Sequence, residues 1–392
     1  MDDHNDSIKS TFRVLRSCQS LNSLGDEYLL STINDSIRSF SKSLYDYDAS
    51  LPKHLSATNC ETPGWIPMTC ATIHISNITS QFDMDGEETL CFMKHVHLLY
   101  RLDDFLETIP SLYAIHDPSS ITRTIHDAFN IFDLTPAYKS TSGSTGSSHS
   151  MHDSSREATG FDCLAGKAFL EHDILELIEL LHGTTVRNAS KFNQRWYTTE
   201  LRTTLLAMVQ QLLESLGQRP RDDREEDVVS DTSATLRMWL HTTGASSVGT
   251  NYQFAFLACL VSARDQTPCL QGLEQHYLAQ AFAQHVSASW RIWNDLGGRI
   301  RDEAEGAFSS CSFVVGNASD SLGSLVSIAN LEADCTALVQ KRLQELVDFG
   351  EGTSSTKSGK RHCLEFFKRA VYLSGDIYLA GDPTRSCVDR VA

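Results

Sequence analysis

Apolar residues recur at helical intervals over most of the chain. Between Glu87 and Ile109 they fall every three or four residues, and Pro110 is expected to end this helix. No series of alternating apolar and polar residues indicates strands, so the pattern predicts an all-α protein. Further helical patterns cover Gly166–Leu181, Arg195–Leu216, Leu278–Glu305, Leu325–Asp348 and Leu364–Tyr378.

Polar and glycine-containing stretches divide the chain. Residues 1–60 are interpreted as a polar arm with short helices, and residues 61–392 as one large helical domain. The apolar segment Leu236–Ala263 is interrupted by Gly244 and Gly249, which predicts a broken helix. Flexible loops are expected near 140–160, 217–231 and 351–361.

Composition and charge limit the classes of function. Hydrophobic residues make up 41% of the 392 residues, enough for a substantial core. The net charge of −17 argues against binding of nucleic acid, which needs a concentrated positive surface. It leaves room for a small anionic substrate, because bound Mg²⁺ reverses the local charge.

The N-terminal residues, the cysteines and the lengths of the apolar runs bear on the cellular location of the protein. The 11 cysteines form no CxxC pair, as expected of reduced thiols, and the acidic start predicts no signal peptide. No apolar run approaches the ~20 residues needed to cross a bilayer. We therefore expect a cytoplasmic protein without membrane insertion, either a monomer or a homodimer.

The pattern Asp-Asp-x-x-Asp/Glu occurs three times. The matches that begin at Asp2 and Asp222 lie in a polar terminus and in a charged loop, so we interpret both as solvated clusters. The third match closes an apolar helix. There Asp103 and Glu107 are four residues apart and share one helix face.

Carboxylates at the entrance of an apolar cavity can bind hard cations there. Val96 and Tyr100 precede the third match on or near the same face. Mg²⁺ prefers oxygen ligands and usually takes only one or two protein carboxylates. The alternative is an ordinary cluster of charges at a helix end with Arg101. The candidate ligands are Asp103, Asp104 and Glu107.

A second candidate metal motif lies in residues 291–306, which read RIWNDLGGRIRDEAEG. Asn294, Gly298 and Asp302 stand at i, i+4 and i+8, so they share one helix face over two turns. An amide oxygen and a carboxylate at these positions can bind one Mg²⁺. Gly298 has no side chain, and a water molecule can occupy its place.

This segment resembles the second metal motif of class I terpene synthases, in particular the class I domain of fungal diterpene synthases of the kaurene synthase type. The chain departs from the fungal pattern at Gly298, where those proteins have Ser and plant kaurene-type enzymes often have Gly. The resemblance extends loosely over residues 85–380 and includes atypical fungal humulene synthases. The matching positions are Asn294, Asp295, Gly297, Arg301, Asp302, Glu305 and Gly306.

The resemblance implies a helical bundle around an apolar cavity and three Mg²⁺ ions that help a prenyl diphosphate to ionise. Asp103, with Asp104 and Glu107, would hold two of the ions, and Asn294 and Asp302 the third. Arg291 would bind the diphosphate, with Arg299 a weaker candidate. The chain lacks the Asp-x-Asp-Asp acid of enzymes that start by protonation. Candidates for the cavity wall, each of which could equally be plain core, are Val96, Tyr100, Gly244, Phe254 and Trp290.

Three functional classes stay open. A class I cyclase accounts for both metal motifs, a chain-elongating prenyltransferase would carry two Asp-rich motifs, and a non-catalytic helical scaffold would need neither. For a cyclase, farnesyl diphosphate and a sesquiterpene product, humulene as the single choice, are expected. Geranylgeranyl or copalyl diphosphate is the alternative substrate. Closure over the substrate is expected from the loop near Gly316 and the segment Tyr378–Asp382.

Overall fold

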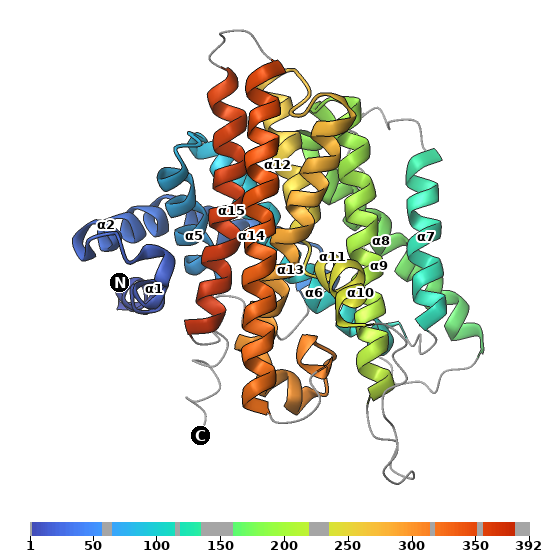
Figure 1. Cartoon of the computed structure of the whole chain (residues 1–392). Coiled ribbons are helices and arrows are strands. Elements are labelled where there is room, and N and C mark those ends of the chain that lie inside the picture. The colour runs from blue at the N-terminus through green and yellow to red at the C-terminus, as the bar shows by residue number, and fades with distance from the viewer. Residues whose placement is uncertain are drawn as a thin grey trace.

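The computed structural model describes residues 2–56, 65–113, 118–134, 160–218, 235–313, 318–350 and 356–380 (Figure 1). Nearly all of these residues are helical and none is in a strand, which confirms the all-α prediction. Of the loops expected near 140–160, 217–231 and 351–361, residues 140–159, 219–231 and 351–355 lie outside the described residues. The rest of these ranges, namely 160, 217–218 and 356–361, is helical rather than loop.

The N-terminal segment is helical throughout most of its length. The stretch expected to be a polar arm forms α1, because Ile8 and Leu15 lie on one side of the helix and join Leu29, Ile33 and Leu373 in a buried cluster. The division near residue 60 stays a prediction. The N-terminal elements are α1 (Asp2–Ser17), η1 (Gln19–Leu21), α2 (Asp26–Ser36), the π-helix η2 (Ile37–Ser41), α3 (Lys42–Ser50) and α4 (Lys53–Ser56).

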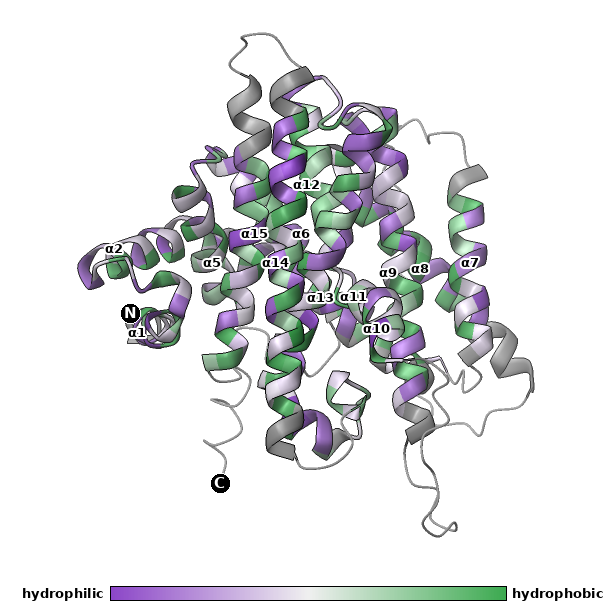
Figure 2. Cartoon of the chain, in the orientation of Figure 1, coloured by the Kyte–Doolittle hydropathy of each residue, from purple (hydrophilic) through white to green (hydrophobic). Residues whose placement is uncertain are grey.

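The remaining helices form the main bundle, in which α13, α14 and α15 pack side by side (Figure 1). Two of its helices, α5 and α12, are buried almost all round, and Figure 2 shows α12 as mainly hydrophobic. The elements are α5 (Trp65–Ser80), α6 (Gly86–Leu112), α7 (Pro118–Leu134), α8 (Gly160–Asn188), α9 (Lys191–Gln218), α10 (Leu236–Trp239), the π-helix η4 (Leu240–Gly244), α11 (Ala245–Ser247), α12 (Thr250–Asp265), α13 (Gly272–Glu305), the 3₁₀ turn η5 (Ser310–Phe313), α14 (Ala318–Gly350) and α15 (Thr356–Ala380).

Helix α6 does not end at Pro110, as the sequence suggested, but continues to Leu112. Pro110 has no N–H to donate to the carbonyl of Leu106, and the helix continues only two residues beyond it. The N–H of Tyr113 bonds the carbonyl of Ile109 at 3.1 Å and closes the helix end. At the other end Asp85 and Glu88 form a capping box, so both limits of α6 have local causes.

The predicted break within Leu236–Ala263 exists, but its sharp point is Gly249 rather than Gly244. Gly249 has φ +70°, a left-handed conformation that glycine adopts without strain. Gly244 instead ends the π-helical turn η4, and its Cα packs against the Trp239 ring. The break separates α11 from α12. At this point the N–H of Gly249 bonds the carbonyl of Ser246 at 3.1 Å, and the carbonyl of Gly249 accepts the first hydrogen bond of α12 from Gln253.

Helices α6, α13 and α15 run in the same direction. At one end of α15, Phe366 packs on Phe92 of α6 with ring centres 5.3 Å apart, and Phe367 packs on Phe282 of α13. At its other end, Tyr378 contacts Trp290 of α13. The same tyrosine reaches Tyr100 of α6 through Trp65, with centre-to-centre distances of 5.7 and 5.3 Å. The C-terminal halves of α6 and α13 therefore point toward the same end of the bundle.

Helix α14 contains a segment, Leu322–Leu346, whose length and mean hydropathy of 1.3 would suffice to cross a membrane. Polar residues are spread through this segment, so it contains no unbroken apolar run. One side of α14 packs along α13 and α15, as in a helix of a packed bundle.

Candidate functional site

A cavity lies where α5, α6, α13 and α15 meet the break between α11 and α12. It has two adjoining parts, which share the lining residues Ile73, Val96, Tyr100 and Ser374. Its wall is mainly apolar and aromatic, which suits a hydrocarbon ligand, and includes the polar residues Thr69, Thr72, Thr250, Gln253 and Ser374. The larger part is lined by Ile73, Phe92, Val96, Leu99, Tyr100, Val248, Thr250, Gln253, Trp290, Phe367, Ala370, Val371 and Ser374.

Four aromatic rings, those of Trp65, Tyr100, Trp290 and Tyr378, line the cavity, and Tyr100 borders both of its parts. Trp65 stacks on Tyr100, and Tyr378 touches both Trp65 and Trp290. Val96, Tyr100 and Trp290, three of the residues predicted from the sequence, are therefore on the wall. Tyr378, expected in a closing segment, also lines the cavity, whereas Gly316 and Asp382 lie outside the described residues.

Both predicted acidic motifs follow cavity residues along their helices. On α6, Asp103 lies one turn beyond Tyr100 and is exposed. On α13, Asn294 lies one turn beyond Trp290. Since α6 and α13 run in the same direction, the two motifs stand at the same end of the cavity. Asp104 and Glu107 belong to α6, but their side chains lie outside the described residues.

Asp302 is a buried carboxylate at this end, with 9% of its surface exposed. Burial and the nearby Asp295 raise its pKa to about 6, an effect that Arg301 and Arg291 only partly offset. Arg301 pairs with it at 3.3 Å. A Cβ on Gly298 would stand 3.1 Å from Nη2 of Arg301 and 3.3 Å from an Asp302 oxygen, so the pair formed by Arg301 and Asp302 packs closely over this glycine.

Arg291 points away from the cavity wall. Its guanidinium pairs with Asp295 at 2.8 Å, donates to Gln211 at 3.1 Å and lies over the Trp239 ring. Asp295 is completely buried and accepts a 2.7 Å hydrogen bond from the N–H of Ser310. The pair ties α13 to α9 and η5, so binding of a diphosphate by Arg291 stays a prediction that this arrangement does not support.

Other predicted residues lie apart from the cavity lining. Arg299 pairs with Glu303 at 3.1 Å on a partly exposed face of α13. Phe254 packs in the core against Trp196 and Phe367, because the α12 face that carries it is turned toward α9 and α15. Gly244 packs on Trp239, so Val248 and Thr250 line the cavity in its place.

Sequence reasoning missed the walls that α5 and α15 contribute. On α15, Phe367, Val371, Ser374 and Tyr378 recur at steps of three or four, a signal that could have identified this stripe. Helix α5 gave no such signal, because residues are buried on all its sides and no apolar face stands out.

Comparison with known proteins points to terpene synthases of fungi. No family model matches the chain. Over 223 residues the chain is 27% identical to an ent-kaur-16-ene synthase of Fusarium fujikuroi, covering 53% of this chain and 23% of that protein. An ent-kaur-16-ene synthase of Phaeosphaeria sp. is 26% identical over 53% of the chain and 22% of its own length. A pimaradiene synthase of Emericella nidulans is 24% identical over 37% and 14%.

These relatives confirm the predicted resemblance to fungal diterpene synthases of the kaurene type. The chain spans about a quarter of the length of the curated relatives it matches. Hedycaryol synthase, solved in complex with HEPES, superimposes on 91% of the chain with 12% identity and a TM-score of 0.46, a likeness that carries no argument. The resemblance to humulene synthases stays a prediction.

Proposed function

We propose that this chain is a class I terpene cyclase that ionises a prenyl diphosphate at the end of the cavity where the two acidic motifs meet. The observation that carries the proposal is the common direction of α6 and α13. Asp103 follows the cavity residue Tyr100, and Asn294 follows the cavity residue Trp290. A scaffold without chemistry has no need to bring such motifs to one mouth of an apolar cavity.

The donor groups at this mouth fit Mg²⁺. The carboxylates of Asp103 and Asp302 and the amide oxygen of Asn294 are the hard oxygen ligands that this ion prefers. The raised pKa of Asp302 reflects a buried carboxylate whose charge its neighbours only partly balance, and a divalent cation would supply that balance. Mg²⁺, three ions by the family resemblance, would neutralise the charge that develops on the departing diphosphate.

The chain's own residues would guide the hydrocarbon. When the bond between carbon and diphosphate oxygen breaks, its electron pair leaves with the diphosphate and an allylic cation remains. Tyr100, Trp65 and Trp290 offer π faces to that cation, each worth about 0.5–2 kcal/mol or more in a dry site. Attack by a double bond of the same chain would close the ring, and loss of a proton would end the reaction.

For the substrate we propose farnesyl diphosphate and a sesquiterpene product, with humulene as the specific choice. Geranylgeranyl or copalyl diphosphate is the second candidate, and the relatives favour it, since they are ent-kaurene and pimaradiene synthases. We further infer a cytoplasmic enzyme, monomeric or homodimeric.

The test is incubation of the purified protein with C15 and C20 prenyl diphosphates, with Mg²⁺ or with a chelator. Released diphosphate and hydrocarbon products are measured, the latter by mass spectrometry. We expect Mg²⁺-dependent release from farnesyl diphosphate. Turnover of C20 substrates alone would overturn the choice of substrate, and no release from any of them would overturn the cyclase.

A matched pair of variants ties the activity to the site. Asp302→Asn should lower turnover at least about 100-fold, as loss of a group that stabilises developing charge commonly does. Asp334→Asn makes the same change on the exposed side of α14 and should leave turnover unchanged. Equal activity of the two variants would remove Asp302 from the proposed metal site.

A further inference from the structure

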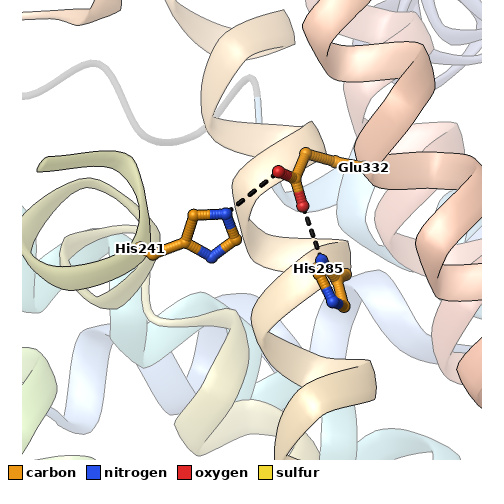
Figure 3. Close-up of side chains that lie close together, drawn as sticks. All are labelled: His241, His285 and Glu332. Carbon is orange, nitrogen blue, oxygen red and sulfur yellow. Dashed lines mark hydrogen bonds and ion pairs between the residues drawn. The ribbon is translucent and has the colours of Figure 1, made fainter. Parts of the chain in front are cut away.

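Three side chains with metal-binding chemistry meet outside the cavity, at the junction of η4, α13 and α14. In Figure 3, Glu332 of α14 stands between the rings of His241 and His285. One carboxylate oxygen lies 2.9 Å from Nε2 of His241, and the other lies 2.6 Å from Nδ1 of His285. The three come from separate elements, so the fold rather than local sequence brings them together.

The geometry of η4 gives His241 its position. This five-residue π-helix, Leu240–Gly244, interrupts the α-helical course between α10 and α11. Such turns are rare and occur frequently at functional sites, because the extra residue redirects a side chain. The carbonyl of His241 is also held by Nε2 of Gln284 at 2.7 Å, next to His285 on α13. The backbone at His241 is thus hydrogen-bonded to α13, the helix that carries His285.

We propose that His241, His285 and Glu332 form a binding site for one divalent transition-metal ion, with Zn²⁺ as its representative. Two imidazoles and one carboxylate make a set typical of Zn²⁺ and related borderline cations, and differ from the all-oxygen set that suits Mg²⁺. The site is distinct from the acidic motifs, because His285 precedes Asn294 by nine residues, about 14 Å along α13.

The distances between the three ligand atoms and the exposure of the two histidines to solvent are compatible with binding of an ion. The ligand atoms all lie within 4.8 Å of one another, and two ligands that share a tetrahedral ion lie roughly 3.4 Å apart, so small side-chain shifts suffice. Both histidine side chains are 25% exposed, which leaves a path from solvent and room for water as a fourth ligand. Each neutral ring presents a lone pair to the ion by carrying its proton on the other nitrogen.

Bound metal would brace the helix break beside the cavity. The side-chain oxygen of Gln284 accepts a 3.1 Å hydrogen bond from Nδ2 of Asn251, and Oδ1 of Asn251 accepts one of 2.8 Å from the hydroxyl of Ser287. Ser287 in turn bonds Thr250, which lines the cavity. An ion that links η4 to α13 and α14 would therefore hold the segment on which Thr250 depends. The role inferred for the metal is structural, at a distance from the reacting carbons.

The test uses the full chain, stripped of metal and kept in excess Mg²⁺ so that oxygen sites are occupied. Titration with Co²⁺, followed by competition with Zn²⁺, should give one ion per chain and the visible absorption of a four-coordinate nitrogen and oxygen site. Absence of a stoichiometric end point, or a band of cobalt bound to thiolate, would overturn the proposal. That band would show that cysteines hold the ion.

Variants then locate the ion. Glu332→Gln and His285→Ala should each weaken binding at least about tenfold, the lower limit seen even for residues that only support metal ligands. The matched control is Glu176→Gln, in the other cluster of possible ligands, formed by His54, Asp173 and Glu176, and it should bind as the parent does. Loss of binding in Glu176→Gln, or full binding in both other variants, would overturn the assignment.

Circular dichroism would check that each variant keeps its helices. If Glu332→Gln does not fold, His241→Gln answers the same question, because that side chain is partly exposed and its loss removes little packing. Binding to His241→Gln as tight as to the parent would exclude the site.

Discussion

Asp295, Gly297 and Gly306 of the segment 291–306 serve the fold rather than a metal ion. Asp295 is buried and bonds the backbone of η5. A Cβ on Gly297 would meet the carbonyl oxygen of Tyr378 at 2.4 Å. Gly306 ends α13 at φ +68°, where the last turn of a helix commonly takes glycine. The sequence predicted the segment and its helix face, but spacing alone could not tell structural positions from ligands.

Arg291 is the clearest case of that limit. From sequence, a residue one turn before Asn294 could turn toward a diphosphate or pair with a carboxylate four residues on. The structure has the second arrangement, with Asp295 as partner. The orientation of the Arg291 side chain depends on hydrogen bonds to Gln211 and to the carbonyl of Phe308. No local sequence pattern reveals that these two residues lie close to Arg291.

The metal assignment predicts the behaviour of single residues in turnover. Asp103→Ala and Asn294→Ala should each abolish diphosphate release while circular dichroism shows an intact fold, because each removes an oxygen ligand at the cavity mouth. Asp2→Ala and Asp223→Ala alter the two other acidic clusters and should have no effect. Full activity of Asp103→Ala or Asn294→Ala, or loss of activity in Asp2→Ala or Asp223→Ala, would mean that the Mg²⁺ ligands lie elsewhere.

Glu332 predicts how stability depends on pH when metal is absent. Burial opposes its ionisation, but hydrogen bonds from His241 and His285 outweigh that effect and lower its pKa from 4.5 to about 2. The stabilisation is therefore complete above pH 4.5 and is lost as pH falls toward 2. One pKa unit corresponds to about 1.4 kcal/mol, so this shift sets an upper limit of about 3.5 kcal/mol, which solvent screening of a half-buried group reduces. At pH 6, Glu332→Gln should therefore lower the free energy of unfolding by roughly 2 kcal/mol.

Denaturant unfolding in a chelating buffer at several pH values would measure this. The difference between parent and Glu332→Gln should shrink between pH 4.5 and 2.5. Glu303→Gln, which changes an exposed partner of Arg299, should cost less than about 1 kcal/mol at every pH. A difference that does not vary with pH would show that Glu332 acts through packing alone.

At the scale of helices, α13 and α15 approach each other closely because glycines face bulky groups across the contact. Gly297 meets the backbone of Tyr378, and Gly375 meets the ring of Trp293. Periodicity predicted that both helices exist, since their apolar stripes are regular, but α13 begins six residues and α15 eight residues before the predicted starts at Leu278 and Leu364. It could not predict their common direction or their contact, which depend on pairing residues some eighty positions apart.

This contact predicts opposite effects for two glycine substitutions. Gly297→Ala should lower the free energy of unfolding by roughly 1–3 kcal/mol, because a methyl group would collide with backbone that cannot rotate away. Gly323→Ala, in α14, meets no atom within 4 Å and should stabilise the protein by up to about 1 kcal/mol through helix propensity. Urea unfolding measures both, and a stabilising Gly297→Ala would contradict the close approach.

At the scale of the whole molecule, one ion pair links the N-terminal segment to the helix that carries the first acidic motif. Asp48 of α3 accepts hydrogen bonds from Arg101 at 2.8 and 2.7 Å and lies 2.7 Å from Nε2 of His97. Burial opposes ionisation of Asp48, but the bonds from Arg101 and His97 outweigh it and lower its pKa. The sequence division near residue 60 could not foresee this link, because nothing near Asp48 indicates its distant partner.

The last prediction follows from that link. Asp48→Asn would remove the carboxylate that accepts two hydrogen bonds from the buried Arg101. It should lower the free energy of unfolding by about 1.5–3 kcal/mol, the range for hydrogen bonds to charged groups. Asp46→Asn, exposed on the same helix, is the matched control and should change it little. If residues 1–60 unfold with the bundle, the variant will melt in one transition at lower urea. Two separate transitions would show instead that the N-terminal segment is an independent unit, and an unchanged midpoint would show that the ion pair adds nothing to stability.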